Sequence, residues 1–180
     1  TVCDFDGQTI GRVEQQPWLD LVPGLPRRSG DVLVAWTDEA RRRLTMDGQA
    51  VTPADVHLRS YLGEIDGTHY VTACTTPAES RVGCIDSGGF RWLSEPGKYT
   101  TATVESDLII TSETTWDRYG AQVTVRDRDY AVLADVDSLA EVPQVEASPT
   151  LLAAGIEDVQ VVVLMPSEHS SEPLPILMNP

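Results

Sequence analysis

The most persistent alternation of apolar and polar residues in the chain runs over 107–137, DLIITSETTWDRYGAQVTVRDRDYAVLADVD. A period of two residues is typical of β-strands that turn one face toward a core. The pattern predicts a meander with strands near 107–112, 121–126 and 129–136. One face of the last strand carries Tyr130, Val132, Ala134 and Val136. We expect the two faces of this strand to divide between core and solvent.

Three Asp-Gly pairs stand between short segments rich in apolar residues, at Asp6–Gly7, Asp47–Gly48 and Asp66–Gly67. Asp-Gly is frequent at the centre of two-residue hairpin turns, because both positions tolerate a positive φ. The pairs therefore predict three hairpins. Another hairpin is predicted over 69–92, and the apolar run at 31–36 predicts a further short strand.

Three segments begin with signals for the start of a helix. A capping hydroxyl precedes each segment, at Thr37, Thr52 and Ser148, and a proline follows the last two. These signals predict short helices over 38–44, 53–60 and 149–154. By contrast, the nearly continuous apolar run VQVVVLM at 159–165 predicts a central strand buried on both faces.

Together these patterns predict a β-dominated α+β fold. We expect mostly antiparallel hairpins and a meander, arranged as a sandwich or barrel, with two or three short helices. A chain of 180 residues has the length of one globular domain. We therefore expect a single domain over 1–180, with lobes 1–97 and 98–180 as the alternative division.

The charge of the chain narrows the range of its partners. It has 28 acidic and 13 basic residues, a formal net charge of −15, and the acidity increases toward the C-terminus. A field of this sign repels phosphate backbones, so we expect no broad nucleic-acid binding. The acidic surface fits a soluble protein, and it also fits an inhibitor or immunity protein that blocks a basic partner.

The three cysteines, Cys3, Cys74 and Cys84, are too few for a scaffold held by disulfides. Cys74 and Cys84 flank the sequence TTPAESRVG in the hairpin predicted over 69–92. They would lie opposite each other if its loop had an odd number of residues. The alternatives are therefore one bridge or two half-buried thiols.

No stretch approaches the roughly 20 apolar residues that cross a bilayer, and no charged-then-apolar leader is present. We expect a soluble protein with no signal peptide, no transmembrane segment and no membrane partner. The sequence does not indicate in which cellular compartment the protein is located.

Residues 2–9, VCDFDGQT, resemble the first motif of haloacid-dehalogenase-like phosphohydrolases. The resemblance implies that Asp4 attacks phosphorus and Asp6 protonates the leaving group, with Mg²⁺ offsetting their charge. It implies supporting roles for Thr37, Lys98, Asp135 and Asp137. Gln8 stands where the family usually has Thr. The same residues also fit an Asp-Gly hairpin turn. Because the other Asp-Gly pairs of the chain predict hairpins, we favour this interpretation.

No other motif predicts catalysis or a metal site. The metal-binding spacings CxxC and HExxH and the nucleophile motif GxSxG are absent from the sequence. His57, His69 and His169 stand in unrelated contexts. We therefore expect no cofactor and no metal, and we favour a protein that is not an enzyme.

Candidate interface residues come from two segments. Trp116, Arg118 and Tyr119 lie at a predicted hairpin tip, where large aromatic side chains need cover and match the composition of interaction hot spots. The second segment is the apolar tail, with Leu174, Pro175, Ile176 and Leu177.

The sequence therefore predicts a non-catalytic structural or protein-interaction module. It would assemble through β-rich surfaces, with itself or with a protein partner, as a component of a virion or another large assembly. The alternatives are an acidic inhibitor of a basic partner and a Mg-dependent phosphohydrolase that uses the DFDG motif.

Overall fold

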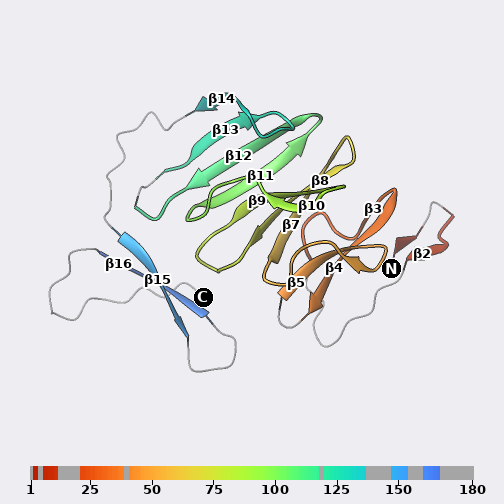
Figure 1. Ribbon diagram of the computed structural model, residues 1–180, viewed down its shortest axis with the longest axis horizontal. Helices are drawn as coiled ribbons and strands as arrows, with labels where there is room; N and C mark the ends of the chain where they lie inside the picture. Colours follow the sequence, from red (N-terminus) through yellow and green to blue (C-terminus); the bar gives the residue numbers. More distant parts are fainter. Residues whose placement is uncertain are drawn as a thin grey trace.

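The computed structural model describes residues 2–3, 6–11, 21–38, 41–117, 120–136, 147–153 and 160–166. These residues form β-strands and no helix (Figure 1). The strands are β1 (Val2–Cys3), β2 (Thr9–Gly11), β3 (Arg27–Ser29), β4 (Asp31–Asp38), β5 (Arg41–Met46), β6 (Gln49–Ala50), β7 (His57–Ile65), β8 (Thr68–Cys74), β9 (Arg81–Asp86), β10 (Gly89–Trp92), β11 (Tyr99–Glu105), β12 (Leu108–Thr114), β13 (Gln122–Arg126), β14 (Val132–Val136), β15 (Ala147–Ala153) and β16 (Gln160–Pro166).

The described strands form three four-stranded antiparallel sheets and two two-stranded hairpins. The first sheet contains β3–β6, the middle sheet β7–β10 and the third sheet β11–β14. In each of them, strands that follow one another in sequence are neighbours in space. Each sheet is therefore one contiguous stretch of the chain. The hairpins pair β1 with β2 and β15 with β16.

The middle sheet has an apolar core on each of its faces. In β8, Val71 belongs to the cluster shared with the first sheet, whereas its neighbour Tyr70 belongs to the cluster shared with the third sheet. Ile85 and Cys84 of β9 divide in the same way. Successive residues of a strand point to opposite faces. The three sheets therefore form layers, with the middle sheet between the other two (Figure 1).

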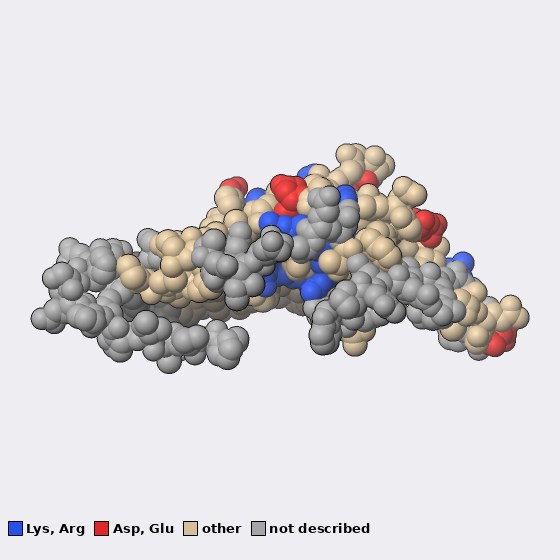
Figure 2. Space-filling view, turned by 90° about the horizontal axis from the view of Figure 1, so that it is seen from below, with Lys and Arg blue, Asp and Glu red and all other residues tan. Residues whose placement is uncertain are grey.

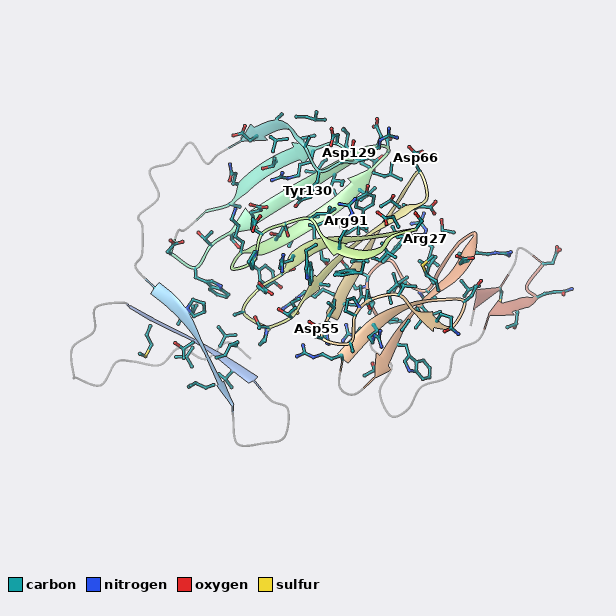
Figure 3. The ribbon with its side chains drawn as sticks, viewed as in Figure 1. Arg27, Asp55, Asp66, Arg91, Asp129 and Tyr130 are labelled. Atoms are coloured by element: carbon teal, nitrogen blue, oxygen red, sulfur yellow. The ribbon has the colours of Figure 1, made fainter. Side chains whose placement is uncertain are left out.

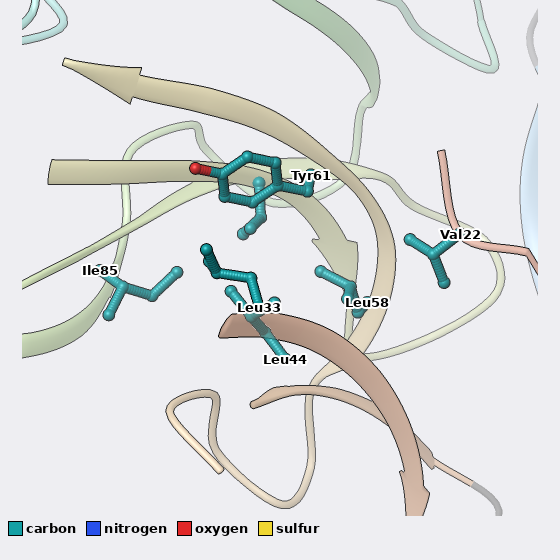
Figure 4. Close-up of a cluster of buried hydrophobic side chains, with 7 residues drawn as sticks. Val22, Leu33, Leu44, Leu58, Tyr61 and Ile85 are labelled. Carbon is teal, nitrogen blue, oxygen red and sulfur yellow. The ribbon is translucent and has the colours of Figure 1, made fainter. Parts of the chain in front are cut away.

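Leucines from both sheets fill the core between the first and middle sheets (Figure 4). Leu33 and Leu44 of the first sheet and Leu58 of β7 are fully buried. Each contributes roughly 1.5–3 kcal/mol by leaving water. The remaining members of the buried cluster are Val22, Tyr61, Val71 and Ile85.

The turn between β13 and β14 fastens the third sheet to the middle sheet. The Tyr70 hydroxyl donates to the Arg128 carbonyl oxygen over 2.8 Å, and the Arg128 guanidinium forms an ion pair with Asp66. Figure 3 shows Asp66 close to Asp129 and Tyr130 of this turn. The β7–β8 and β13–β14 turns therefore meet at one end of the two sheets.

The three predicted helices are wrong. Residues 38–44 lie in β4, in β5 and in two connecting residues outside the described part, and 53–60 form a turn that leads into β7. Residues 149–153 lie in β15, where Pro149 pairs with Leu164 of β16. Capping signals act only locally, so cross-strand pairing overrides them here.

The burial predicted for two strands is also wrong. All residues of β14 are exposed, so it has no core face, and Tyr130 lies before the strand with a φ of 69°. β16 is not central, because it pairs with β15 alone and exposes Val161, Leu164 and Met165.

The predicted turns are confirmed. Asp47–Gly48 joins β5 to β6, and Asp66–Gly67 joins β7 to β8, with positive φ at all four residues. The alternation over 107–137 also predicts β12, β13 and β14 to within a few residues. The pattern at 69–92 corresponds to β8, β9 and β10.

Candidate assembly surface

The β15–β16 hairpin has an unusual composition for this chain. Its strands, ASPTLLA and QVVVLMP, contain no charged residue, although the chain as a whole carries a net charge of −15. The hairpin stands apart from the three sheets (Figure 1). It is therefore an uncharged element on an acidic protein.

Both faces of this hairpin are apolar and open to solvent. Leu152 pairs with Val161 on one face, which also carries Met165, and Pro149 pairs with Leu164 beside Leu151 on the other. The exposed fractions of its large apolar side chains are 38% for Leu151, 50% for Leu152, 43% for Val161, 48% for Leu164 and 41% for Met165.

A two-stranded hairpin alone is at best marginally stable in water, because it buries little apolar surface against the entropy of ordering its chain. Among the described strands, β15 and β16 pair only with each other, and no sheet is in extensive contact with them. A surface that covers the leucines and valines would stabilise the hairpin by roughly 25 cal/mol for each Å² buried.

The third sheet exposes a second surface that is poor in charge and mixes apolar side chains with hydroxyls. Its inner face holds the buried Ile109, Thr111 and Thr124, so the residues that alternate with them point away from the middle sheet. We call this side the outer face. Two cross-strand rows form it, Thr103–Ile110–Val125–Ala134 and Thr101–Ser112–Val123–Val136.

Val136 is 65% exposed at one end of its row, and Val123 beside it is 38% exposed. Among the strands of the third sheet, Glu105 at the end of β11 is the one charged side chain on the outer face.

β14 is one of the two edge strands of the third sheet, with β11 at the other edge. It exposes Val132 and Leu133 as well as Val136, and it pairs with β13 on one side only. Edge strands with apolar side chains and free backbone groups are places where another strand adds.

Trp116, from the predicted interface, lies between β12 and β13 and is partly buried. Its indole N–H donates to the Ala78 carbonyl oxygen over 2.9 Å, so the chain itself covers part of this side chain. Arg118 and Tyr119 lie outside the described residues, as do Leu174, Pro175, Ile176 and Leu177. The interface role of these residues stays a prediction.

Lys and Arg side chains gather in the middle of one face of the molecule (Figure 2). Several arginines support loops. Arg41 and Arg59 donate to backbone carbonyls of the loop 75–80, and Arg43 donates to the Thr52 carbonyl. These guanidinium groups hold connections between strands in place.

In the motif VCDFDGQT, Asp6 and Gly7 lie between β1 and β2, which pair as a hairpin. Asp6 is exposed, and Asp4 lies outside the described residues. Every named strand pair is antiparallel, so the parallel sheet that the phosphohydrolase resemblance implies does not occur among the described strands.

All three cysteines are free thiols. Cys74 lies opposite His57 and Cys84 opposite Tyr70, so the two are not cross-strand partners. Burial raises the pKa of the Cys84 thiol, although the positive charge of Arg91 acts in the opposite direction.

The described residues contain no group of three or more His, Cys, Asp or Glu side chains placed to hold a metal ion. Over the same part of the chain, no helix has the length and apolar character needed to span a membrane.

Sequence reasoning missed the exposed side chains of β15 and β16 and of the outer face. The signal for the hairpin was the absence of charge over 147–153 and 160–166 in a strongly acidic chain. The outer face gave no comparable signal, because its exposed valines alternate like those of an ordinary core strand.

No protein-family model matches the chain, and no curated protein matches it.

Proposed function

We propose that the chain is a non-catalytic structural module that assembles with copies of itself through uncharged β-surfaces in its C-terminal part. The observation that carries this proposal is the β15–β16 hairpin, with apolar side chains exposed on both faces and no charge in either strand. Exposed apolar surface of this kind marks protein interaction sites.

Self-association is favoured over a basic partner by the charge of these surfaces. A basic protein would bind where carboxylates are dense, whereas β15 and β16 have none. Two copies of a chain with a net charge of −15 repel each other, so they can touch with least repulsion where both lack charge. The role is that of a building block in a larger assembly.

The test measures the mass of the protein in solution by sedimentation velocity over a range of concentrations. We expect the wild-type chain to form oligomers. Leu152→Asp places a charge on one face of the hairpin and Leu164→Asp places one on the other, and the double variant should weaken association at least tenfold. Gln49→Asp is the matched control, because it adds one negative charge at an exposed strand position of the first sheet. A wild-type chain that stays monomeric at its highest soluble concentration contradicts the proposal.

A further inference from the structure

The outer face of the third sheet and the β15–β16 hairpin are two uncovered surfaces of the same chain. Val123 and Val136 are exposed on the outer face, and Leu152 and Val161 are exposed on the hairpin. In the structure neither surface covers the other, and the hairpin stands away from its own third sheet (Figure 1).

The two surfaces also match in charge. The hairpin strands have no charged residue, and the outer face has Glu105 alone, at the end of β11. In a chain with a net charge of −15, contact between these surfaces brings together few like charges. Other faces of the molecule carry charged side chains, as Figure 2 shows for one of them.

The geometry of both surfaces suits layer packing. A pair of strands can lie flat on a sheet at the usual spacing of about 10 Å, with side chains interdigitating between the layers. The hairpin face with Leu152, Val161, Val163 and Met165 exposes three large apolar side chains, Leu152, Val161 and Met165, whereas the other face exposes two, Leu151 and Leu164. The Leu152 face of the hairpin would pack against the two rows of the outer face that end at Ala134 and at Val136.

We infer that the Leu152 face of the β15–β16 hairpin of one copy packs on the outer face of the third sheet of a second copy. This inference rests on the proposed self-assembly and names its contact. A reciprocal exchange of hairpins closes a dimer, whereas an exchange in one direction builds a chain of copies.

Cysteine cross-linking between two differently tagged copies tests the contact. Both carry Cys3→Ser, because Cys3 is exposed, whereas Cys74 and Cys84 are buried. One copy carries Val136→Cys and the other Leu152→Cys, and a short bifunctional maleimide is added to their mixture. We expect a cross-linked species that contains both tags, and a several-fold lower yield when Leu164→Cys on the opposite hairpin face replaces Leu152→Cys.

Three outcomes overturn the inference. The first is oligomers without a cross-link between positions 136 and 152, which leaves self-assembly intact and makes this contact wrong. The second is more efficient cross-linking from position 164. The third is a chain with Val136→Cys and Leu152→Cys together that cross-links within monomers at high dilution, because the hairpin then covers its own sheet. Sedimentation of the uncross-linked protein separates these results from a failure of self-assembly.

Discussion

Glu113 is a buried carboxylate on the inner face of the third sheet, with 8% of its side chain exposed. The Lys98 ammonium lies 2.9 Å from one carboxylate oxygen, and the Arg126 guanidinium lies 4.0 Å from the other. Arg126 also stacks over the Tyr130 ring, with its guanidinium carbon 4.3 Å from the ring centre. The single negative charge of Glu113 therefore interacts with two cations. One of them, the Arg126 side chain, is only 16% exposed.

Glu113→Gln should lower the free energy of unfolding by about 2–3 kcal/mol, because it leaves the buried guanidinium of Arg126 without a counter-charge. Urea denaturation measures this change. Glu105→Gln is the control, because this carboxylate is exposed on the same sheet and should change the free energy by less than about 0.5 kcal/mol. Equal effects of the two variants would mean that the charge of Glu113 is not structural.

Tyr130 gives the fold a dependence on alkaline pH. Burial raises the pKa of its phenol from 10.0 to about 12, although Arg126 acts in the opposite direction. The folded state therefore holds the phenol proton more tightly than the unfolded state. The stability from this group is complete below about pH 10 and is lost as the pH rises through 12.

We therefore expect the free energy of unfolding to fall between pH 10 and 12, and Tyr130→Phe should reduce the slope. Burial also raises the pKa of Tyr61 and Tyr70, so part of the slope remains in the variant. Denaturation curves at several pH values measure both slopes. Identical slopes in the wild type and Tyr130→Phe would remove Tyr130 as a cause.

Gly24 has a φ of +83° and lies directly against the Tyr61 backbone, where an added Cβ would collide with the carbonyl oxygen. Gly48 has nearly the same φ, +81°, but open space around it. Gly48→Ala should cost about 1–2 kcal/mol, from backbone strain alone. Gly24→Ala should cost about 3 kcal/mol or more, because strain and collision add. Thermal unfolding compares the two, and equal losses would show that the collision is relieved by a shift of the loop.

At the scale of elements, the loop 75–80 connects the three sheets. Arg41 from the first sheet, Arg59 from the middle sheet and Trp116 next to the third sheet all donate to its backbone carbonyls, over 2.9–3.4 Å. The Glu79 side chain in this loop is buried and accepts from the Gly97 N–H. Side chains therefore hold most of this loop, and at its end Ser80 also bridges to Tyr99 through backbone hydrogen bonds.

Trp116→Phe removes the donor to the Ala78 carbonyl but keeps most of the apolar ring. We expect faster amide hydrogen exchange over 75–80 and a loss of about 1 kcal/mol in stability. Mass spectrometry of exchanged peptides measures the first effect. Trp36→Phe, on a 37% exposed tryptophan of the first sheet, is the control and should leave exchange in this loop unchanged. Unchanged exchange in Trp116→Phe would mean that Arg41 and Arg59 hold the loop without it.

The sequence predicts elements well where the signal lies within a hairpin. Asp47–Gly48 and Asp66–Gly67 specify their turns because both residues of each pair have a positive φ, which Asp-Gly tolerates. The helix predicted over 149–154 is wrong because Ser148-Pro149 fits the first turn of a helix and also a strand, and pairing with β16 decides between them. Ser148 and Pro149 pair with Met165 and Leu164, which lie 17 and 15 positions further along the chain, and a local signal does not include them.

Burial was harder to predict than strand position. The apolar run at 159–165 indicates a strand whose side chains are buried against other residues. In the described part of the chain, no residues bury Val161, Leu164 and Met165 of β16, and the sequence did not indicate this. Similarly, alternation in β14 is compatible with a core face, although all five residues of this edge strand are exposed. The exposure of the β15–β16 hairpin could therefore be inferred only from its lack of charge, and that of the outer face had no signal in the sequence.

At the scale of the whole molecule, the middle sheet belongs to two cores at once. Leu58 lies in the core with the first sheet, and Ile109 of the third sheet lies in the other. Leu58→Ala and Ile109→Ala should each cost about 3 kcal/mol, since both residues are fully buried.

Because both cores use the middle sheet, we expect the three sheets to unfold in one transition in each variant. Tryptophan fluorescence and far-ultraviolet circular dichroism should then give coincident urea curves. Two separated transitions in Ile109→Ala would show that the third sheet unfolds independently of the other two.

The contiguity of each sheet also sets the order of events during synthesis. Residues 27–50 emerge from the ribosome before the other two sheets, and they form a sheet whose leucines, Leu33 and Leu44, still lack the middle-sheet side of their core. The strands of the middle sheet follow and close the first core, while their other face is left bare until 99–136 are made. A nascent chain that pauses between these two stages exposes one complete apolar face, and that pause is the point at which it most needs a chaperone.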